Sequence, residues 1–173
     1  MQPIMPINTR HLRCQTGENI RMPNTIACAA ELTVDRPPAA ALALFTAEGE
    51  RAWAPGWQPA FPAARRRKGA GAVFVTTDDA QTTTWIMVDQ NECWVRYARV
   101  TDGAAAGTVA VSVLDAQPTR TRLRVSYDLT ALSPDGARWL EAFADGFDRY
   151  IAHWETAIAA TLPDHHPGQT PSR

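Results

Sequence analysis

Hydrophobic and polar residues alternate in several short segments between Thr25 and Leu132, which is the pattern of strands that bury one face. The predicted strands are Thr25–Val34 and five segments that begin at Ala72, Thr82, Cys93, Thr108 and after Pro118. The turn-forming residues between these five are Asp78-Asp79, Asp89 to Glu92, Thr101-Asp102-Gly103 and Gln117 to Thr119. Because short turns join neighbouring strands, we expect an antiparallel sheet.

The last predicted strand has the clearest alternation. One face carries Arg120, Arg122, Arg124 and Ser126, and the other carries Leu123, Val125, Tyr127 and Leu129. Because burying three arginines would be costly, we expect the arginine face in solvent and Tyr127 in the core. A short turn after Gln117 would pair Val113 with Leu123, Val111 with Val125 and Val109 with Tyr127.

The hydrophobic spacing changes to three and four residues towards the C-terminus and predicts a long helix from Ser133 to Leu162. Its apolar stripe consists of Leu140, Phe143, Phe147, Ile151, Trp154 and Ile158. A sheet with one apolar face must bury it, so we expect this helix to cover the sheet and to be the most buried helix. Two short helices should follow the first strand, one ending near Phe45 and one starting at Gly49.

Which face of the segment 93–101 points inward stays open, because a shift of one residue exchanges its two faces. Either Trp94, Arg96 and Ala98 or Val95, Tyr97 and Arg99 would face the core. An inward arginine would be a costly buried charge unless it met a carboxylate or an anionic ligand. The other interpretation is an exposed arginine, or one that pairs with Asp145 or Asp148 of the long helix.

Composition excludes several classes of function. The 173 residues carry a net charge of −1, which gives no reason to expect nucleic acid as a partner. Cys14, Cys28 and Cys93 have neither the spacing of a zinc site nor the density of a disulfide scaffold. No run approaches the roughly 20 apolar residues needed to span a bilayer. We expect a cytoplasmic protein without metal, cofactor or integral membrane association, either a monomer or a homodimer.

Three regions are predicted along the chain. They are a weakly ordered leader at 1–23, a single domain at 24–162 and a polar tail at 163–173. Residues 57–71 predict an irregular strand or a loop. The basic run Arg65-Arg66-Arg67-Lys68 within it could attract a phosphate or a membrane surface, but such runs are more often simply solvated. His153, the one histidine outside the leader and tail, forms no nucleophile set with a recognisable Ser or Cys motif, so no catalytic residue is assigned.

The order of strand, two short helices, antiparallel strands and one long C-terminal helix resembles the helix-grip fold of the START-like, or SRPBCC, superfamily. This group includes polyketide cyclases and dehydrases, lipid-transfer domains and pollen-allergen-like ligand carriers. Three local segments are similar to a bacterial branch of unassigned function, namely LFTAEGERAWAPGW at 44–57, TTTW at 82–85 and DLTALSPDG at 128–136. The resemblance implies an α+β fold in which a curved antiparallel sheet wraps around the long helix and leaves a cavity.

Aromatic residues are the candidates for lining such a cavity, since rings bring apolar area and Tyr or Trp can also orient a ligand. The candidate ligand-binding residues are Trp57, Trp85, Trp94, Tyr97, Tyr127, Phe143, Phe147 and Tyr150, with Trp53 nearby. The alternative is a filled core. We expect a small hydrophobic ligand, and we expect Phe in place of Ala144 to fill its site. The alternatives are an enzyme of the polyketide cyclase or aromatase kind and an interaction module like chaperone-ATPase activators.

Overall fold

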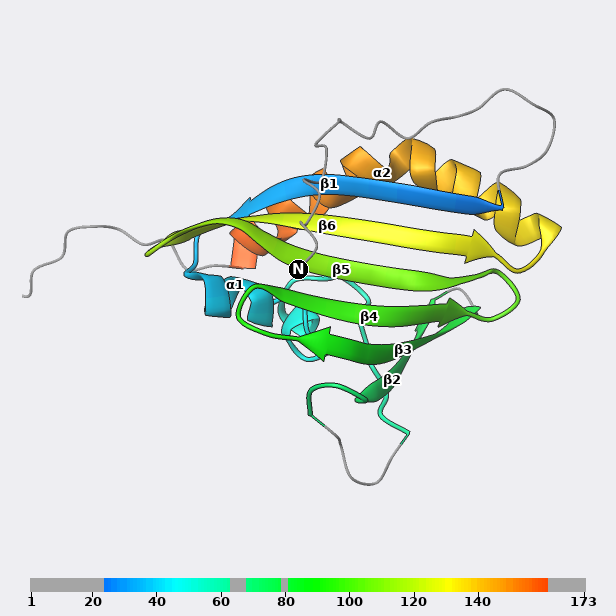
Figure 1. Ribbon diagram of the computed structural model, residues 1–173, viewed down its shortest axis with the longest axis horizontal. Coiled ribbons are helices and arrows are strands. Elements are labelled where there is room, and N and C mark those ends of the chain that lie inside the picture. The colour runs from blue at the N-terminus through cyan, green and yellow to red at the C-terminus, as the bar shows by residue number, and fades with distance from the viewer. Residues whose placement is uncertain (1–23, 63–67, 79–80, 162–173) are drawn as a thin grey trace, which may run out of the picture.

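The computed structural model of the protein describes residues 24–62, 68–78 and 81–161, and its elements follow the predicted order (Figure 1). The strands are β1 (Thr25–Val34), β2 (Val73–Asp78), β3 (Gln81–Gln90), β4 (Trp94–Thr101), β5 (Ala105–Gln117) and β6 (Arg120–Ala131). The helices are α1 (Pro38–Ala43), the short 3-10 helix η1 (Gly49–Ala52) and α2 (Pro134–Thr161). The predicted leader and tail and the residues Arg65 to Arg67 lie outside the described residues.

The six strands form one antiparallel sheet in the order β1-β6-β5-β4-β3-β2. Strands β2 to β6 follow one another as consecutive hairpins, and the last strand, β6, pairs with the first strand, β1. Figure 1 shows α2 along one face of the curved sheet, where it packs mainly on β1 and β6. We call this the inner face. The helix-grip arrangement that the resemblance implied is confirmed.

The predicted pairing of the last two strands is confirmed. Val113 lies opposite Leu123, Val111 opposite Val125 and Val109 opposite Tyr127. All three β6 residues in these pairs are buried on the inner face. The inner face of the sheet therefore continues unbroken from β6 into β5.

The arginines of β6 lie on the outer face, as predicted. Arg122 and Arg124 both bind Glu31 of β1, at 3.0 and 3.2 Å, and Arg120 binds Asp35 at 2.6 Å. These side chains are exposed, so solvent screens the charges and each pair contributes little to stability. All three arginines lie on the exposed face of β6, so its buried face carries no charge.

The helix α2 presents its predicted stripe to the sheet. Leu140, Phe147, Ile151 and Ile158 are at most 2% exposed, whereas Phe143 and Trp154 are only partly buried. The helix starts within one residue of the prediction, because the Ser133 hydroxyl accepts a hydrogen bond from the Gly136 N–H at 3.0 Å. Most buried helical residues of the described chain belong to α2.

The predicted starts of β2, β3 and β4 are each within one residue of the structure, but the start of β5 and the end of α1 were wrong by more. Strand β5 begins at Ala105 instead of Thr108, because its first residues do not alternate between hydrophobic and polar. Close packing against β6 requires a small residue there: a Cβ atom at Gly107 would lie 1.9 Å from the carbonyl oxygen of Asp128. Helix α1 ends at Ala43 instead of Phe45, since the following amides bond to carbonyls only three residues back, which tightens the last turn.

Both edges of the sheet have partners beyond the strands. At the β2 edge, Ala60 forms a two-bond bridge with Val75, with both N–H to oxygen distances at 2.8 Å. In the described part of the segment 57–71, this isolated bridge corresponds to the irregular strand that the sequence predicts. At the β1 edge, the Thr33 N–H donates to the Glu155 carboxylate of α2 at 2.8 Å.

Replacing Phe147 by Ala should lower the free energy of unfolding by about 3 to 5 kcal/mol, because the ring is packed on all sides. Phe147 is 2% exposed and contacts the rings of Tyr127 and Phe143 at centroid distances of 5.5 Å. Denaturant unfolding of both proteins measures the difference. Phe143→Ala, at a partly exposed ring, should cost less. A Phe147→Ala loss as small as that of a surface substitution would contradict this packing.

Candidate ligand-binding cavity

A cavity of about 820 Å³ lies between α2 and the inner face of the sheet. The loop after α1 and the helix η1 contribute Phe45, Glu50, Trp53 and Trp57 to its wall. The sheet contributes Phe74, Trp85, Tyr97, Arg99, Val109, Val111 and Tyr127, and α2 contributes Gly146, Arg149, Tyr150, His153, Trp154 and Ala157. The wall is mainly aromatic and apolar, with a few polar groups, which is the usual make-up of a small-molecule site.

Two indoles fix the segment that closes one side of the cavity. The Trp53 indole N–H donates to the Leu44 carbonyl oxygen, and the Trp57 indole N–H donates to the Ala47 carbonyl oxygen, both at 2.8 Å. Both tryptophans also line the cavity. Because the polar edge of each indole is satisfied by backbone, its apolar surface is free to face the cavity.

Aromatic rings of the sheet form one continuous wall. Phe74 and Trp85 stack with a centroid distance of 5.9 Å, and Tyr97 meets both rings edge to face. Trp57 joins them from the loop, 5.8 Å from Trp85. On the helix side, Tyr150 and Trp154 contact each other at 5.0 Å. These contacts hold the rings in fixed orientations around the space.

The cavity gathers five of the eight predicted ligand-binding residues, and these are Trp57, Trp85, Tyr97, Tyr127 and Tyr150. Phe143 and Phe147 pack against Tyr127 outside the cavity wall. Trp94 lies on the outer face of β4, where its indole N–H donates to the Asp89 carboxylate at 3.0 Å. The structure does not bring Trp94 to the other candidates.

The open question of the β4 faces is decided by its pairing with β5. Val95 lies opposite Val111 and Tyr97 opposite Val109, and both β5 residues are already fixed on the inner face by β6. Val95 and Tyr97 are therefore buried, and Arg99 shares their face. Arg96, on the other face, is exposed.

Glu50 is a functional candidate that the sequence did not indicate. Its carboxyl faces the cavity from η1, and burial raises its pKa to about 8. The group is therefore mostly protonated at neutral pH and can donate a hydrogen bond or a proton. In the sequence, Glu50 is linked to the aromatic candidates only by its position three residues before Trp53, and this spacing does not indicate that its carboxyl is buried.

Three tyrosine hydroxyls accompany this carboxyl. Burial is the largest cause that raises the pKa of Tyr97, Tyr127 and Tyr150, and the negative charge of Glu50, once ionised, raises all three further. The Tyr97 hydroxyl donates to the Phe45 carbonyl oxygen at 3.1 Å. The hydroxyls therefore stay protonated over the physiological range and serve as hydrogen-bonding groups.

Arg99 has an unusual environment. Its guanidinium carbon lies 5.3 Å from the ring centroids of Trp85 and Trp139 and 5.8 Å from that of Tyr127. Cation–π contacts of this kind stabilise the charge by about 0.5 to 2 kcal/mol each. Its Nε atom, however, is buried and has no hydrogen-bond partner among the described residues. Within the same residues no ion pair joins Arg99 to Asp145 or Asp148.

Arg99 also borders a second, more open recess of about 690 Å³. Its lining residues are Asp78, Gln81, Thr82, Thr83, Arg99, Asp102 and Trp139. Asp78, Thr83 and Arg99 line both spaces. Arg99 therefore stands where the aromatic cavity meets a polar opening to solvent.

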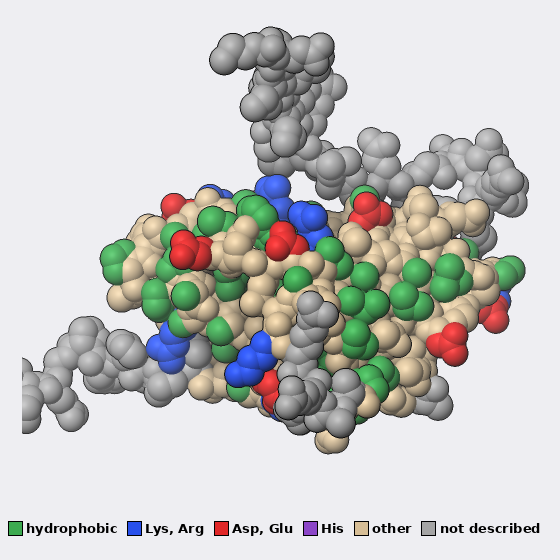
Figure 2. Space-filling model, turned by 60° about the horizontal axis from the view of Figure 1, so that its bottom comes forward, with side chains coloured by type: hydrophobic (Ala, Val, Ile, Leu, Met, Phe, Trp, Pro, Cys, Tyr) green, Lys and Arg blue, Asp and Glu red, His purple; other side chains and the backbone are tan. Residues whose placement is uncertain are grey.

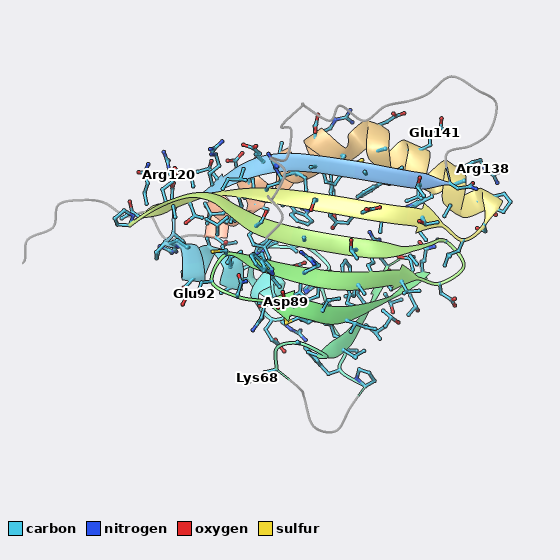
Figure 3. All side chains as sticks on the ribbon, in the orientation of Figure 1. Lys68, Asp89, Glu92, Arg120, Arg138 and Glu141 are labelled. Atoms are coloured by element: carbon cyan, nitrogen blue, oxygen red, sulfur yellow. The ribbon has the colours of Figure 1, made fainter. Side chains whose placement is uncertain are left out.

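Other charged and exposed apolar side chains lie outside the cavity wall. Among them are the charged residues labelled in Figure 3, none of which lines the cavity: Lys68, Asp89, Glu92, Arg120, Arg138 and Glu141. On the outer face of the sheet, Val73, Ile86, Val88, Val100 and Leu114 are exposed. In the face presented by Figure 2, hydrophobic side chains are interspersed with polar and charged ones.

Within residues 24–62, 68–78 and 81–161, no cluster of three or more His, Cys, Asp and Glu residues could hold a metal ion. No described helix is long and apolar enough to cross a membrane.

Comparison with known proteins gives structural matches alone. No protein-family model and no curated protein sequence matches the chain. Truncated norcoclaurine synthase from Thalictrum flavum superposes with a TM-score of 0.57 at 14% identity, over 82% of this chain and 96% of that chain. The Zhui aromatase/cyclase from a Streptomyces species gives 0.54 at 15%, over 79% and 92%. A protein from Arthrobacter aurescens gives 0.53 at 14%, over 84% and 94%. At such identities the likeness shows the fold.

Glu50→Gln should remove a pH-dependent loss of stability. The pKa of the Glu50 carboxyl is 4.5 in the unfolded chain and about 8 in the folded protein. Between these two pH values the folded state therefore keeps a proton that the unfolded state has lost. Wild-type stability should therefore fall, relative to the variant, as pH rises through this window, and the difference should be absent below it. Thermal melts across the pH range measure the effect.

The control for this prediction is Glu141→Gln, at an exposed glutamate of α2 (Figure 3). It should keep the pH profile of the wild type. If the melting profile of Glu50→Gln also followed that of the wild type, Glu50 would ionise as an ordinary solvated carboxyl.

Proposed function

The chain has the fold of the START-like, or SRPBCC, superfamily, and on that basis we propose that it binds a small, mainly hydrophobic molecule between α2 and the sheet. The observation that carries the proposal is the cavity of about 820 Å³ with its aromatic wall. A filled core would leave no such space, because protein interiors pack as densely as organic crystals. Apolar contact with the rings would supply most of the affinity.

The polar groups of the cavity suggest how such a ligand would be oriented. Glu50 and Tyr97 lie among the apolar rings of the wall, and Arg99 lies at the polar opening. A ligand with a ring system and one polar end would fit this division. Trp57 and Trp85 both line the cavity and would report its occupation by a change in fluorescence.

A second candidate function is an enzyme of the polyketide cyclase or aromatase kind. The specific observation in its favour is Glu50, a protonated carboxyl with a pKa of about 8 that faces the cavity. A group with a pKa near the working pH is suited to proton transfer. The Tyr97 proton is already donated to the Phe45 carbonyl oxygen, so the Tyr150 hydroxyl of the cavity wall is the one that could hold a carbonyl oxygen of the substrate. In this case Glu50→Gln would stop conversion of a bound ketone while binding persisted, which mass spectrometry of the incubated ligand would detect.

The exposed apolar residues of the outer face keep the third hypothesis, an interaction module, open to test. This function would not use the cavity. A protein that bound no apolar probe would favour it over the two cavity-based functions.

The cavity should bind the neutral fluorescent amine phenylnaphthylamine saturably, one molecule per chain, and Gly146→Phe should abolish this binding. Gly146 lines the cavity, and a Cβ atom built on it meets no atom within 4 Å, so a ring added there has room to enter. Ala144, the position chosen from the sequence, packs against the core but does not line the cavity. Fluorescence titration measures the loss of binding.

Gly146→Ala is the matched control. It should retain binding and should stabilise α2 by about 1 kcal/mol, because alanine replaces glycine within a helix. Melting curves establish that Gly146→Phe is folded. Unsaturable binding by the wild type, or unchanged binding by a folded Gly146→Phe protein, would place the probe outside the cavity.

A further inference from the structure

Arg99 is partly buried, and the described residues leave its buried Nε donor without a hydrogen-bond partner. Three rings surround it, yet ring faces attract the charge without accepting the full set of N–H hydrogen bonds that water would. The buried Nε atom has no partner in the described residues. A buried donor left in this state costs free energy, so its retention beside a cavity points to a partner that arrives from outside.

The surrounding charges favour an anion as that partner. Glu50 lines the same cavity but is mostly protonated at neutral pH, so it supplies little counter-charge. Asp78 lines both the cavity and the adjoining recess and Asp102 borders the recess, but both are exposed and neither forms an ion pair with Arg99 in the described residues. Arg149 adds a second positive group from α2.

We propose that Arg99 anchors an anionic oxygen group of the ligand, and that the protein therefore selects organic acids with an apolar, ring-containing body. This proposal rests on the proposed binding function and names its ligand class. The acid group would lie at the polar opening, where the cavity joins the recess and Arg99 and Thr83 line both. The apolar body would extend between the Trp85 wall and the Tyr150 side of α2.

The chemistry of guanidinium supports this assignment. Its planar set of N–H donors matches the geometry of a carboxylate or sulfonate, and charge-assisted hydrogen bonds are about twice as strong as neutral ones. Contact with the Trp85 and Trp139 rings would hold the group in place before the ligand binds. Preorganisation of this kind lowers the entropic cost of binding.

Two probes that share one aromatic skeleton test the proposal: anilinonaphthalene sulfonate, which is anionic, and phenylnaphthylamine, which lacks the sulfonate. At neutral pH the wild type should bind the sulfonate at least about tenfold more tightly than the amine, and each should displace the other. Arg99→Gln should remove this preference, because it should weaken binding of the sulfonate at least about tenfold more than binding of the amine. Fluorescence titrations give the four dissociation constants.

Arg96→Gln is the matched control, because Arg96 lies three residues away on the same strand but faces outward. It should keep the preference for the sulfonate in full. Arg99→Lys, which keeps the charge without the planar donors, should keep part of it. If Arg99→Gln fails to fold in a melting experiment, Arg99→Met replaces it, since it preserves an apolar stem between the rings.

The outcomes separate this proposal from the proposed function. Equal affinity of the wild type for both probes, or a preference that survives in a folded Arg99→Gln or Arg99→Met protein, would overturn the role of Arg99 but not the binding function. A preference lost equally in Arg96→Gln would also overturn it, since it would then reflect overall charge. Failure of the wild type to bind either probe saturably would overturn the binding function itself.

Discussion

The register of the β4, β5 and β6 ladder is the constraint on which the rest of the structure depends. Successive residues of a strand point to opposite faces, so a slip of one residue between β6 and β5 would turn Val109 of β5 and Tyr97 of β4 outward together. Turning β6 over instead would place its arginines on the inner face, against α2. The solvated charge on one face of β6 therefore determines, two strands away, which side of β4 reaches the cavity.

This propagation explains how far the sequence could predict the site. The strand order of the hairpins, the pairing of Val113 with Leu123 and the long helix follow from patterns that local residues carry. Predicting which face of β4 points inward would have required knowing that Thr101 pairs with Ala105. The run of small residues after Gly103 shows no alternation of hydrophobic and polar positions, so the sequence does not reveal that register. The burial of Glu50 depends on a short turn packed under distant rings, which sequence spacing does not encode. The space at Gly146 is equally hidden, because it arises from a missing side chain.

The cavity combines features that oppose each other in an ordinary core. Stacked rings such as Phe74 and Trp85 stabilise the inner face, while Glu50 and the Nε atom of Arg99 are held where solvation is poor. Polar groups in such surroundings weaken a fold, and evolution tends to retain them where they act on another molecule. The hydrogen bonds from Trp53 and Trp57 to the backbone keep the loop over these groups in place.

The treatment of the two sheet edges has a consequence for self-association. An open edge strand is a template on which another chain can add a strand, and this is a common route to aggregation. Here Ala60 occupies part of the β2 edge, and Glu155 of α2 takes up a backbone N–H at the β1 edge. Copies of the protein that approached edge to edge would therefore meet an obstacle at Ala60 on one edge and at Glu155 on the other.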